Sequence, residues 1–194
     1  MKSILVCGVG AIGSNLAAYL SSDVRDEYAI TVLDRDVVEE RNLQAGTQFY
    51  LRDQVKIPKV EALQYNIHKQ YNRTIDIIHG VFMKSENSMI QAFDLLVDAF
   101  DNLEARSAIT VACRTHSVPC IHIGFGKQFT WSILWNSGYA PPETAVDWDI
   151  CEISGASSFV HFVAAIGSSV IQEYLTTGKK REFCGNRFSI REIE

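Results

Sequence analysis

Residues 3–20 read Ser3-Ile4-Leu5-Val6-Cys7-Gly8-Val9-Gly10-Ala11-Ile12-Gly13-Ser14-Asn15-Leu16-Ala17-Ala18-Tyr19-Leu20, and this stretch decides the fold. The apolar run 3–7 is typical of a buried parallel strand, and the run 14–20 predicts a helix. Between them, the GxGxxG spacing predicts that Gly8 takes a tight turn, that Gly10 lets backbone approach a phosphate, and that Gly13 lets the helix pack close to the strand. The positive end of the helix then faces an anion. The alternative is a tight turn that binds nothing.

The alternation of strand and helix continues to residue 123. Strands are predicted over 29–33, 74–78, 94–98 and 119–123, and helices after Pro58, over 88–93 and over Glu104–His116. Such alternation favours a parallel sheet with right-handed crossovers. We therefore predict an α/β fold, a Rossmann-like and mostly parallel sheet with helices on both faces.

The pattern changes after residue 123. Residues 129–135 predict an antiparallel strand, and residues 136–156 predict a long loop that serves as a crossover or lid. A helix with an apolar face follows over 157–177, and the tail 187–193 alternates polar and apolar residues like an edge strand. Antiparallel C-terminal strands thus complete a single domain over residues 1–194.

The composition is that of a globular protein with a sizeable core, since 47% of the 194 residues are hydrophobic and 21% are charged. A net charge of −5 gives no reason to expect a nucleic acid or an anionic membrane as a partner. The apolar helix over 157–177 contains polar residues and does not qualify as a membrane span. Five cysteines without a CxxC pair favour a reducing compartment, and we expect a cytoplasmic protein.

Cys113, His116, Cys120 and His122 superficially resemble a zinc site. The first pair falls on a predicted helix, whereas the second alternates along a predicted buried strand. Convergence on one metal ion is therefore geometrically awkward, and buried structural roles are favoured.

Further motifs follow the glycine turn in a fixed order. Asp34 ends the second predicted strand, in the region where an acidic residue of dinucleotide-binding folds meets a ribose hydroxyl. The remaining motifs are Leu33-Asp34-x-Asp36-x-Val38-Glu39, Asn42-Leu43, Pro58-Lys59-x-Glu61, Asp98-x-x-Asp101-Asn102-x-x-x-Arg106 and Cys151-x-x-x-Gly155 before a helix with Gly167-Ser168. In this order and spacing, the chain resembles the superfamily of ubiquitin-activating-enzyme-like adenylyltransferases, typified by ThiF, MoeB and HesA. The resemblance covers nearly the whole chain and implies the same fold.

The resemblance also implies a reaction. Such proteins bind MgATP, attack its α-phosphate with a carboxylate and release pyrophosphate. The carboxylate usually ends a ubiquitin-like carrier protein, such as a sulfur carrier. ATP and Mg²⁺ are therefore the expected cofactors, and a ubiquitin-like carrier or a small-molecule carboxylate of cofactor biosynthesis is the expected substrate.

The resemblance assigns roles to single residues. Asp34 would accept the ribose hydroxyls, Lys59 would bring positive charge to the phosphates, and Asp101 would hold Mg²⁺. Taken singly, these residues have simpler interpretations as a strand end, a solvated lysine and part of a helix cap. The expected nucleotide-binding residues are Gly8, Gly10, Ala11, Gly13, Asp34, Asp36, Asn42, Lys59 and Asn102, the expected catalytic residues are Lys59, Asp101 and Cys151, and the expected metal ligand is Asp101.

The chain departs from the family pattern at one arginine. In the family, Asn-Leu is usually followed by x-Arg-Gln, whose arginine contacts the phosphates, whereas residues 42–48 read Asn42-Leu-Gln-Ala-Gly-Thr-Gln48. Charge for the developing pyrophosphate would then come from Lys59, Arg41, Arg52 or a partner subunit. This loss makes full activity an open question at the level of the sequence.

Cys151 matches the cysteine that forms a covalent intermediate in some relatives. A thiol in a loop is nucleophilic when its pKa is lowered, but neighbouring acidic residues such as Asp149 disfavour the thiolate. A covalent role and a structural role both stay open here.

The leading hypothesis is ATP-dependent adenylylation of a carboxylate. One alternative is a non-catalytic nucleotide-binding interaction module, which the missing arginine favours. The other is an NAD-dependent dehydrogenase, which shares the glycines and Asp34 but leaves Lys59 and Asp101 unexplained. A homodimer is expected, because Phe129, Trp131, Trp135 and the apolar face after Ser157 offer more apolar area than one small domain needs.

Overall fold

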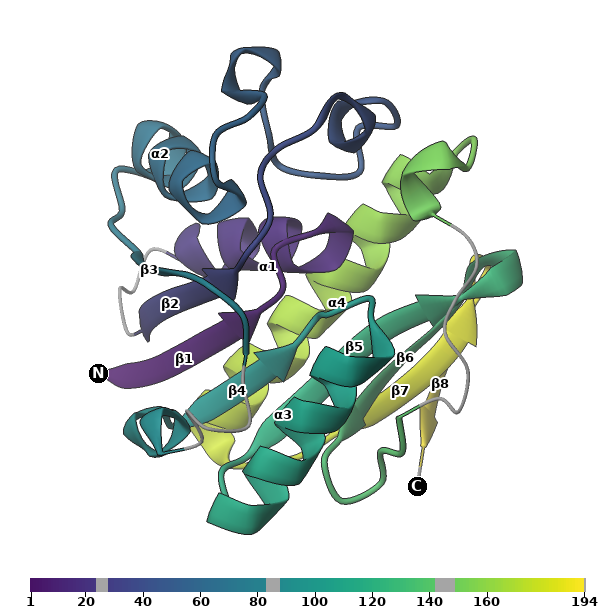
Figure 1. The fold of residues 1–194 in the computed structure, drawn as a ribbon. Helices are drawn as coiled ribbons and strands as arrows, with labels where there is room; N and C mark the ends of the chain where they lie inside the picture. Colours follow the sequence, from purple (N-terminus) through teal and green to yellow (C-terminus); the bar gives the residue numbers. More distant parts are fainter. Residues whose placement is uncertain (24–27, 83–87, 142–148, 194) are drawn as a thin grey trace.

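The computed structural model describes residues 1–23, 28–82, 88–141 and 149–193, and these form one eight-stranded sheet (Figure 1). The strand order is β3-β2-β1-β4-β5-β6-β7-β8. The strands are β1 (Lys2–Cys7), β2 (Tyr28–Asp34), β3 (Asp76–His79), β4 (Leu95–Asp98), β5 (Cys120–Gly126), β6 (Thr130–Trp135), β7 (Glu182–Asn186) and β8 (Ser189–Ile193). The helices are α1 (Ala11–Ser21), α2 (Lys59–Tyr71), α3 (Leu103–His116) and α4 (Ala156–Thr177), with short 3-10 turns η1 (Glu40–Leu43), η2 (Arg52–Gln54), η4 (Met89–Ala92), η5 (Lys127–Phe129) and η6 (Ile150–Glu152).

Strands β1 to β5 are parallel, as predicted, and β1 lies between β2 and β4. Its last residue, Cys7, lies opposite Leu33 of β2 and Asp98 of β4. The chain leaves β1 towards β2 and β3, and then returns to place β4 on the other side of β1. This reversal creates a switch point at the carboxyl ends of β1 and β4, where open α/β sheets bind ligands.

The second half of the sheet is antiparallel, from β5 through β6 and β7 to β8. The predicted strand over 129–135 and the predicted edge strand over 187–193 are confirmed as β6 and β8. The sequence did not indicate β7, because Glu182–Asn186 contains Gly185 and lacks an alternating apolar pattern. In the sheet, Phe183 packs against the core, and this packing stabilises the strand although the segment also contains residues that favour a turn.

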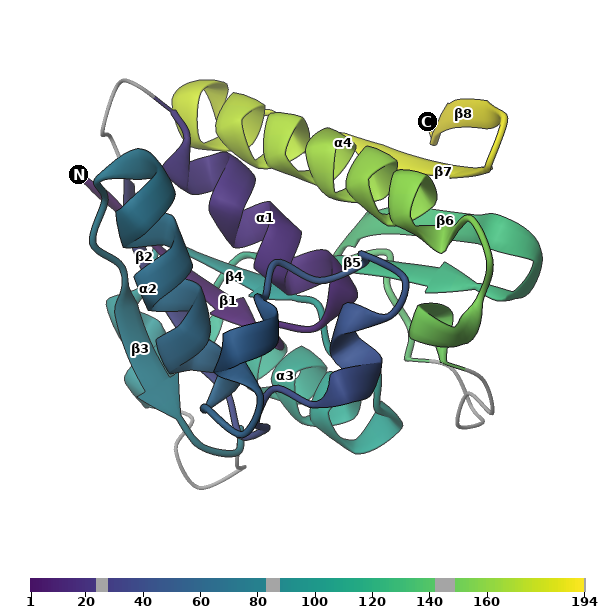
Figure 2. The same cartoon turned by 90° about the horizontal axis from the view of Figure 1, so that it is seen from above.

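Helices cover both faces of the sheet, as predicted (Figure 2). The strand alternation explains this, since successive side chains of β1 point to opposite faces. Ile4 and Val6 join a core with α1, α2 and α4, whereas Leu5 and Cys7 join a second core with α3. Helices α1 and α4 pack side by side on the first face (Figure 2).

The apolar face of α4 is buried inside this chain. Trp131 of β6 packs edge-on against Phe162, and Trp135 packs against Tyr174. Both tryptophans are less than 5% exposed. The aromatic residues that suggested a dimer interface therefore cover the subunit's own helix, and they are not a surplus of exposed apolar area.

The predicted loop over 136–156 is only partly described, because residues 142–148 lie outside the described part of the chain. After that gap, residues 150–152 form the short turn η6, which leads directly into α4. Within the described ranges, no helix has the length and apolar character needed to cross a membrane.

Candidate active site

The glycine turn has the geometry that its spacing predicts. Gly8 has a φ of +85°, in the left-handed region that favours glycine, and its N–H donates to the Leu33 carbonyl at 2.8 Å. A Cβ on Gly13 would lie 1.8 Å from the Gly8 carbonyl oxygen, so α1 can pack this closely only with glycine there. A Cβ on Gly10 would meet open space. There is thus open space beside Gly10, where a ligand can approach the backbone, and α1 begins at the next residue with the N–H groups of its first turn, which have no partners within the helix.

Asp34 ends β2 directly beside this turn and is buried. Its Oδ2 accepts the Val9 N–H at 2.8 Å, and its Oδ1 accepts the Asp36 N–H at 2.9 Å. Burial raises the pKa of the Asp34 carboxyl, although the charge of Lys59 and the two amide donors oppose that rise. Asp34 thus fixes the backbone of the turn, and each carboxylate oxygen retains a second lone pair for a ribose hydroxyl.

Lys59 is the first residue of α2 and reaches back towards β2. Its Nζ lies 3.2 Å from Asp36 Oδ2, and its backbone N–H donates to the Asp36 carbonyl at 2.9 Å. An isolated bridge between Val37 and Pro58 holds the two segments together. Lys59 is buried, in contrast to the solvated lysine of the simpler interpretation. A buried cation at the positive end of a helix is unfavourable by itself and suits a site that receives an anion.

Asn42 and Arg41 lie in η1, and both contact Glu39. The Asn42 Oδ1 accepts the Glu39 N–H at 2.8 Å and caps the turn. The Arg41 guanidinium is paired with Glu39 at 2.6 Å and lies 3.7 Å from Asp149. Arg41, one of the cations considered as a substitute for the missing arginine, is therefore already paired with carboxylates of this chain, although its side chain is largely exposed.

The segment after β4 brings Asp101 to the same edge as the glycine turn. The Ala99 N–H donates to the Cys7 carbonyl at 2.9 Å, and a Cβ on Gly8 would lie 2.9 Å from Phe100. Asn102 caps α3, because its Oδ1 accepts the Ala105 N–H at 2.8 Å, and Asp101 is exposed. An exposed carboxylate on this loop fits Mg²⁺, which binds through one or two carboxylates, water and substrate phosphates.

A network of buried polar side chains holds the loop that carries Asp101 in place, and the sequence did not predict this network. Arg106 donates to the Phe100 and Ile123 carbonyls and to the Tyr139 hydroxyl, at 2.5, 3.0 and 3.0 Å. Asp98 lies 2.8 Å from His122 Nδ1, and the His122 ring stacks on Tyr139. Asp98 and Arg106 belong to one family motif, and that spacing was the available signal for their contact. Nothing in the sequence pattern pointed to Tyr139.

Cys151 is buried in η6, whereas the sequence predicted a loop. Its Sγ lies 3.3 Å from Thr47 Oγ1 and accepts a hydrogen bond from Gln48 Nε2 at 3.1 Å. Burial raises the pKa of the Cys151 thiol; the bonds from Thr47 and Gln48 lower it, and Asp149 raises it again. The thiol is consequently protonated at neutral pH in this conformation. The covalent role stays a prediction.

Tyr50 is a second residue that the sequence did not single out. It comes from the irregular segment 37–57, yet it is buried, and its hydroxyl donates to the Val9 carbonyl at 2.6 Å. Burial raises the pKa of Tyr50 well above its ordinary value, and the charges of Asp34 and Asp36 add to the rise. The hydroxyl therefore stays protonated as a donor to the glycine turn.

The histidines of the candidate zinc cluster have different partners in different parts of the structure. His122 pairs with Asp98, whereas His116 Nδ1 lies 2.6 Å from Gln91 at the far end of α3. Among the residues that the structure describes, no three His, Cys, Asp or Glu side chains are grouped to hold a metal ion.

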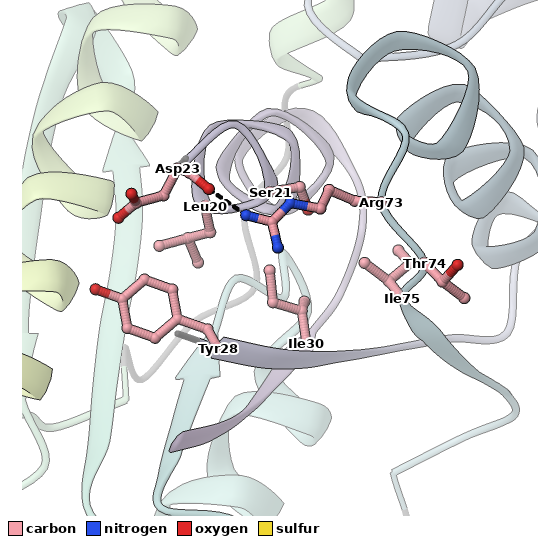
Figure 3. A pocket seen from close by; sticks show the side chains of 8 residues that line it. All are labelled: Leu20, Ser21, Asp23, Tyr28, Ile30, Arg73, Thr74 and Ile75. Carbon is pink, nitrogen blue, oxygen red and sulfur yellow. Dashed lines mark hydrogen bonds between the residues drawn. The ribbon is translucent and has the colours of Figure 1, made fainter. Parts of the chain in front are cut away.

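A small cavity lies at the opposite edge of the sheet, around the start of β2 (Figure 3). Its volume is about 20 Å³, which is room for roughly one water molecule. Arg73 points across it and donates to the Asp23 carbonyl (Figure 3). The lining residues are Leu20, Ser21, Asp23, Tyr28, Ile30, Arg73, Thr74 and Ile75. The cavity is too small for a nucleotide and is separate from the carboxyl edge.

Comparison with known proteins agrees with this geometry. The sequence model of the ThiF family matches residues 1–177. The chain is 32% identical over 115 residues to the adenylyltransferase and sulfurtransferase MOCS3 of Aedes aegypti, a match that covers 58% of this chain and 25% of that protein. It is 32% identical over 136 residues to the sulfur carrier protein ThiS adenylyltransferase of Bacillus subtilis, a match that covers 65% of this chain and 39% of that protein. The chain thus spans well under half the length of these relatives.

The fold also matches solved structures. The complex of E. coli MccB with ATP superposes with a TM-score of 0.77 at 15% identity, over 100% of this chain and 63% of that one. The structure of PaaA superposes with a TM-score of 0.74 at 16% identity, over 100% of this chain and 73% of that one. At this level of identity, the likeness establishes the Rossmann-like fold.

Proposed function

Because the chain belongs to the ThiF family, we propose that it transfers AMP from ATP to a carboxylate. The single observation that supports this most is that four parts with suitable chemistry lie at the carboxyl ends of the neighbouring strands β2, β1 and β4. These parts are the glycine turn, Asp34, the buried cation Lys59 and the exposed carboxylate Asp101. A dehydrogenase needs the first two of these parts and has no use for the last two.

In the proposed mechanism, the amides of Gly10 and Ala11 receive the phosphates and Asp34 accepts the ribose hydroxyls. Lys59 leaves Asp36 for the phosphates, where positive charge stabilises the charge that develops in the transition state. Asp101 would hold Mg²⁺, and the metal ion would supply positive charge against the phosphates when bound. A carboxylate oxygen of the substrate attacks the α-phosphorus, the bond to the bridging oxygen breaks, and pyrophosphate leaves with that electron pair. The products are an acyl adenylate and pyrophosphate.

The proposed substrate is the C-terminal carboxylate of a ubiquitin-like or sulfur-carrier protein. Relatives support this class, since one acts on the sulfur carrier ThiS and others activate SUMO and SAMP modifiers. MccB has been solved with the peptide MccA, so a peptide carboxylate is a related possibility. A small-molecule carboxylate of cofactor assembly is the other candidate substrate.

Three further parts of the proposal concern the setting of the reaction. We propose Mg²⁺ as the metal, a homodimer as the working form and the cytoplasm as the compartment. The five free thiols suit a reducing compartment. The homodimer is proposed on the family likeness alone, since the β6 aromatic residues that first suggested it are buried inside the subunit.

A second function, a non-catalytic nucleotide-binding module, is favoured by one observation. Arg41 is paired with Glu39 and lies near Asp149, so it would have to leave both carboxylates before it could replace the missing family arginine. Lys59 then carries the phosphate charge without help from Arg41.

The experiment that tests the proposal is ATP–pyrophosphate exchange on the purified protein, with carrier proteins, their C-terminal peptides and small carboxylates as substrates. Nucleotide binding is measured in parallel with MgATP and NAD. Exchange that depends on a carboxylate supports the adenylyltransferase. Binding of MgATP without exchange under any substrate supports the module, and binding of NAD in preference to ATP supports the dehydrogenase.

A further inference from the structure

Segment 47–50 lies across the start of α1, although sequence analysis gave it no role. The Asn15 Nδ2 donates to the Thr47 carbonyl at 2.7 Å, and the Phe49 N–H donates to the Ser14 hydroxyl at 3.1 Å. That hydroxyl in turn donates to the Gly10 carbonyl at 2.7 Å. The segment is therefore fixed to the first two turns of the helix that carries the glycine turn.

The same segment is held from its other side by α2. The Asn66 Nδ2 donates to the Phe49 carbonyl at 2.8 Å and to Gln54 Oε1 at 3.0 Å. Lys59, the cation proposed to contact the phosphates, is the first residue of α2. The same helix therefore also positions segment 47–50 over the glycine turn.

Tyr50 completes this arrangement at a single residue, Val9, whose carbonyl belongs to the same peptide unit as the Gly10 N–H. Its hydroxyl donates to the Val9 carbonyl at 2.6 Å, while the Val9 N–H donates to Asp34 at 2.8 Å. The residue between Gly8 and Gly10 is thus held at both its donor and its acceptor. A backbone that is held in its ligand-binding conformation before the ligand arrives binds that ligand more tightly, because less ordering remains to be done.

We propose that Tyr50 is a positioning residue for the nucleotide. It acts through the Val9 peptide and holds the amides of Gly10 and Ala11 towards the triphosphate. This inference rests on the proposed function for the identity of its ligand, a nucleoside triphosphate. It assigns Tyr50 no contact with the nucleotide and no part in bond making.

The test compares Tyr50→Phe with a matched control, Tyr28→Phe. Both tyrosines are buried to a similar degree, at 8% and 9% exposed, and Tyr28 lies at the amino end of β2, beside the small cavity of Figure 3. Both variants keep the ring and lose only the hydroxyl. We expect Tyr50→Phe to bind MgATP roughly tenfold more weakly, because the Val9 carbonyl loses its donor and the competent loop conformation becomes a minor one. Tyr28→Phe should bind MgATP as the wild type does.

Amide hydrogen exchange gives a readout that does not depend on the nucleotide. The amides of residues 9–13 should exchange faster in Tyr50→Phe and at the wild-type rate in Tyr28→Phe. A merely structural role of the Tyr50 hydroxyl would lower the melting temperature of Tyr50→Phe and leave the MgATP affinity of the folded protein unchanged. Unchanged affinity, or unchanged exchange at residues 9–13, would overturn the inference.

Pyrophosphate exchange by the wild type separates this inference from the proposed function. If the wild type binds MgATP but catalyses no exchange, the adenylyltransferase proposal fails while the affinity comparison still decides the role of Tyr50. A wild type that binds no MgATP would overturn both.

Discussion

Replacement of Lys59 by alanine separates the chemistry of the site from its stability. In the described part of the chain, Lys59 Nζ forms an ion pair with Asp36 at 3.2 Å, in which the lysine side chain is 10% exposed and the carboxylate 52%. Because water screens the half-exposed Asp36 carboxylate, the pair contributes at most about 1 kcal/mol to stability, as exposed pairs do, although the lysine itself is buried. Removing a cation from the positive end of α2 returns about 0.3–1 kcal/mol. The two effects nearly cancel, and the melting temperature of Lys59→Ala should therefore stay close to that of the wild type.

The effect on the reaction should be far larger. Loss of one donor that stabilises developing charge costs roughly 2.7–4 kcal/mol, which corresponds to about 10²–10³ in rate. Arg41 is engaged by Glu39 and is not poised to compensate. We therefore expect ATP–pyrophosphate exchange in Lys59→Ala to fall by about two to three orders of magnitude.

The assay is pyrophosphate exchange at saturating MgATP and carboxylate, with thermal unfolding of the same samples. Lys69→Ala is the matched control, because it removes an exposed lysine from the last turn of the same helix. Full exchange in Lys59→Ala would refute the placement of the phosphates beside α2. A large fall in the melting temperature would instead show that the Lys59 charge supports the fold.

Three other residues give independent predictions. Asp101→Asn should abolish Mg²⁺-dependent exchange without unfolding the protein, because this carboxylate is exposed; titration with MgCl₂ checks this, and Asp53→Asn is an exposed control. Cys151→Ala should keep adenylate formation, and alkylation of Cys151 in the wild type should be slow at pH 7 and accelerate only above the ordinary thiol pKa, because burial raises the pKa of this thiol. The rate of labelling is measured by mass spectrometry over a pH series, and fast labelling at pH 7 would contradict this prediction. Gly13→Ala should destabilise the protein by more than about 3 kcal/mol, because its methyl group would overlap the Gly8 carbonyl; a wild-type urea midpoint would count against the close packing of α1.

Much of the fold was predictable because its signals are local. The strand, glycine turn and helix of residues 3–20 each follow from residue type and spacing, and the alternation of later elements implied the parallel sheet. Strand β7 was missed because its residues favour the strand conformation only when β6 and β8 lie beside them. The contacts of Trp131 with α4 were likewise invisible, since they join residues about thirty positions apart. The same distance in sequence made the aromatic residues look like surplus apolar surface.

The motif residues of the site were predictable from the sequence, whereas the residues that hold them in place were not. Asp34 and Asp101 lie at the carboxyl edge because parallel strands end together, a consequence of topology that spacing can indicate. Lys59 begins α2 and is held beside them by Asp36. Tyr50 and Tyr139 contact the site through single hydroxyl groups that reach backbone or arginine from irregular segments. No periodicity marks such a contact. The burial of Cys151 was missed for a related reason, because Thr47 and Gln48 enclose it from a segment a hundred residues away.

The most direct measurement of the central claim follows an oxygen atom. A carboxylate substrate labelled with ¹⁸O is incubated with MgATP and the protein, and hydroxylamine traps the activated acyl group. If the carboxylate attacks the α-phosphorus, one ¹⁸O atom appears in the released AMP and none in pyrophosphate. Unlabelled AMP from a reaction that consumes ATP, or label in pyrophosphate or phosphate, would contradict the proposal that this chain forms an acyl adenylate.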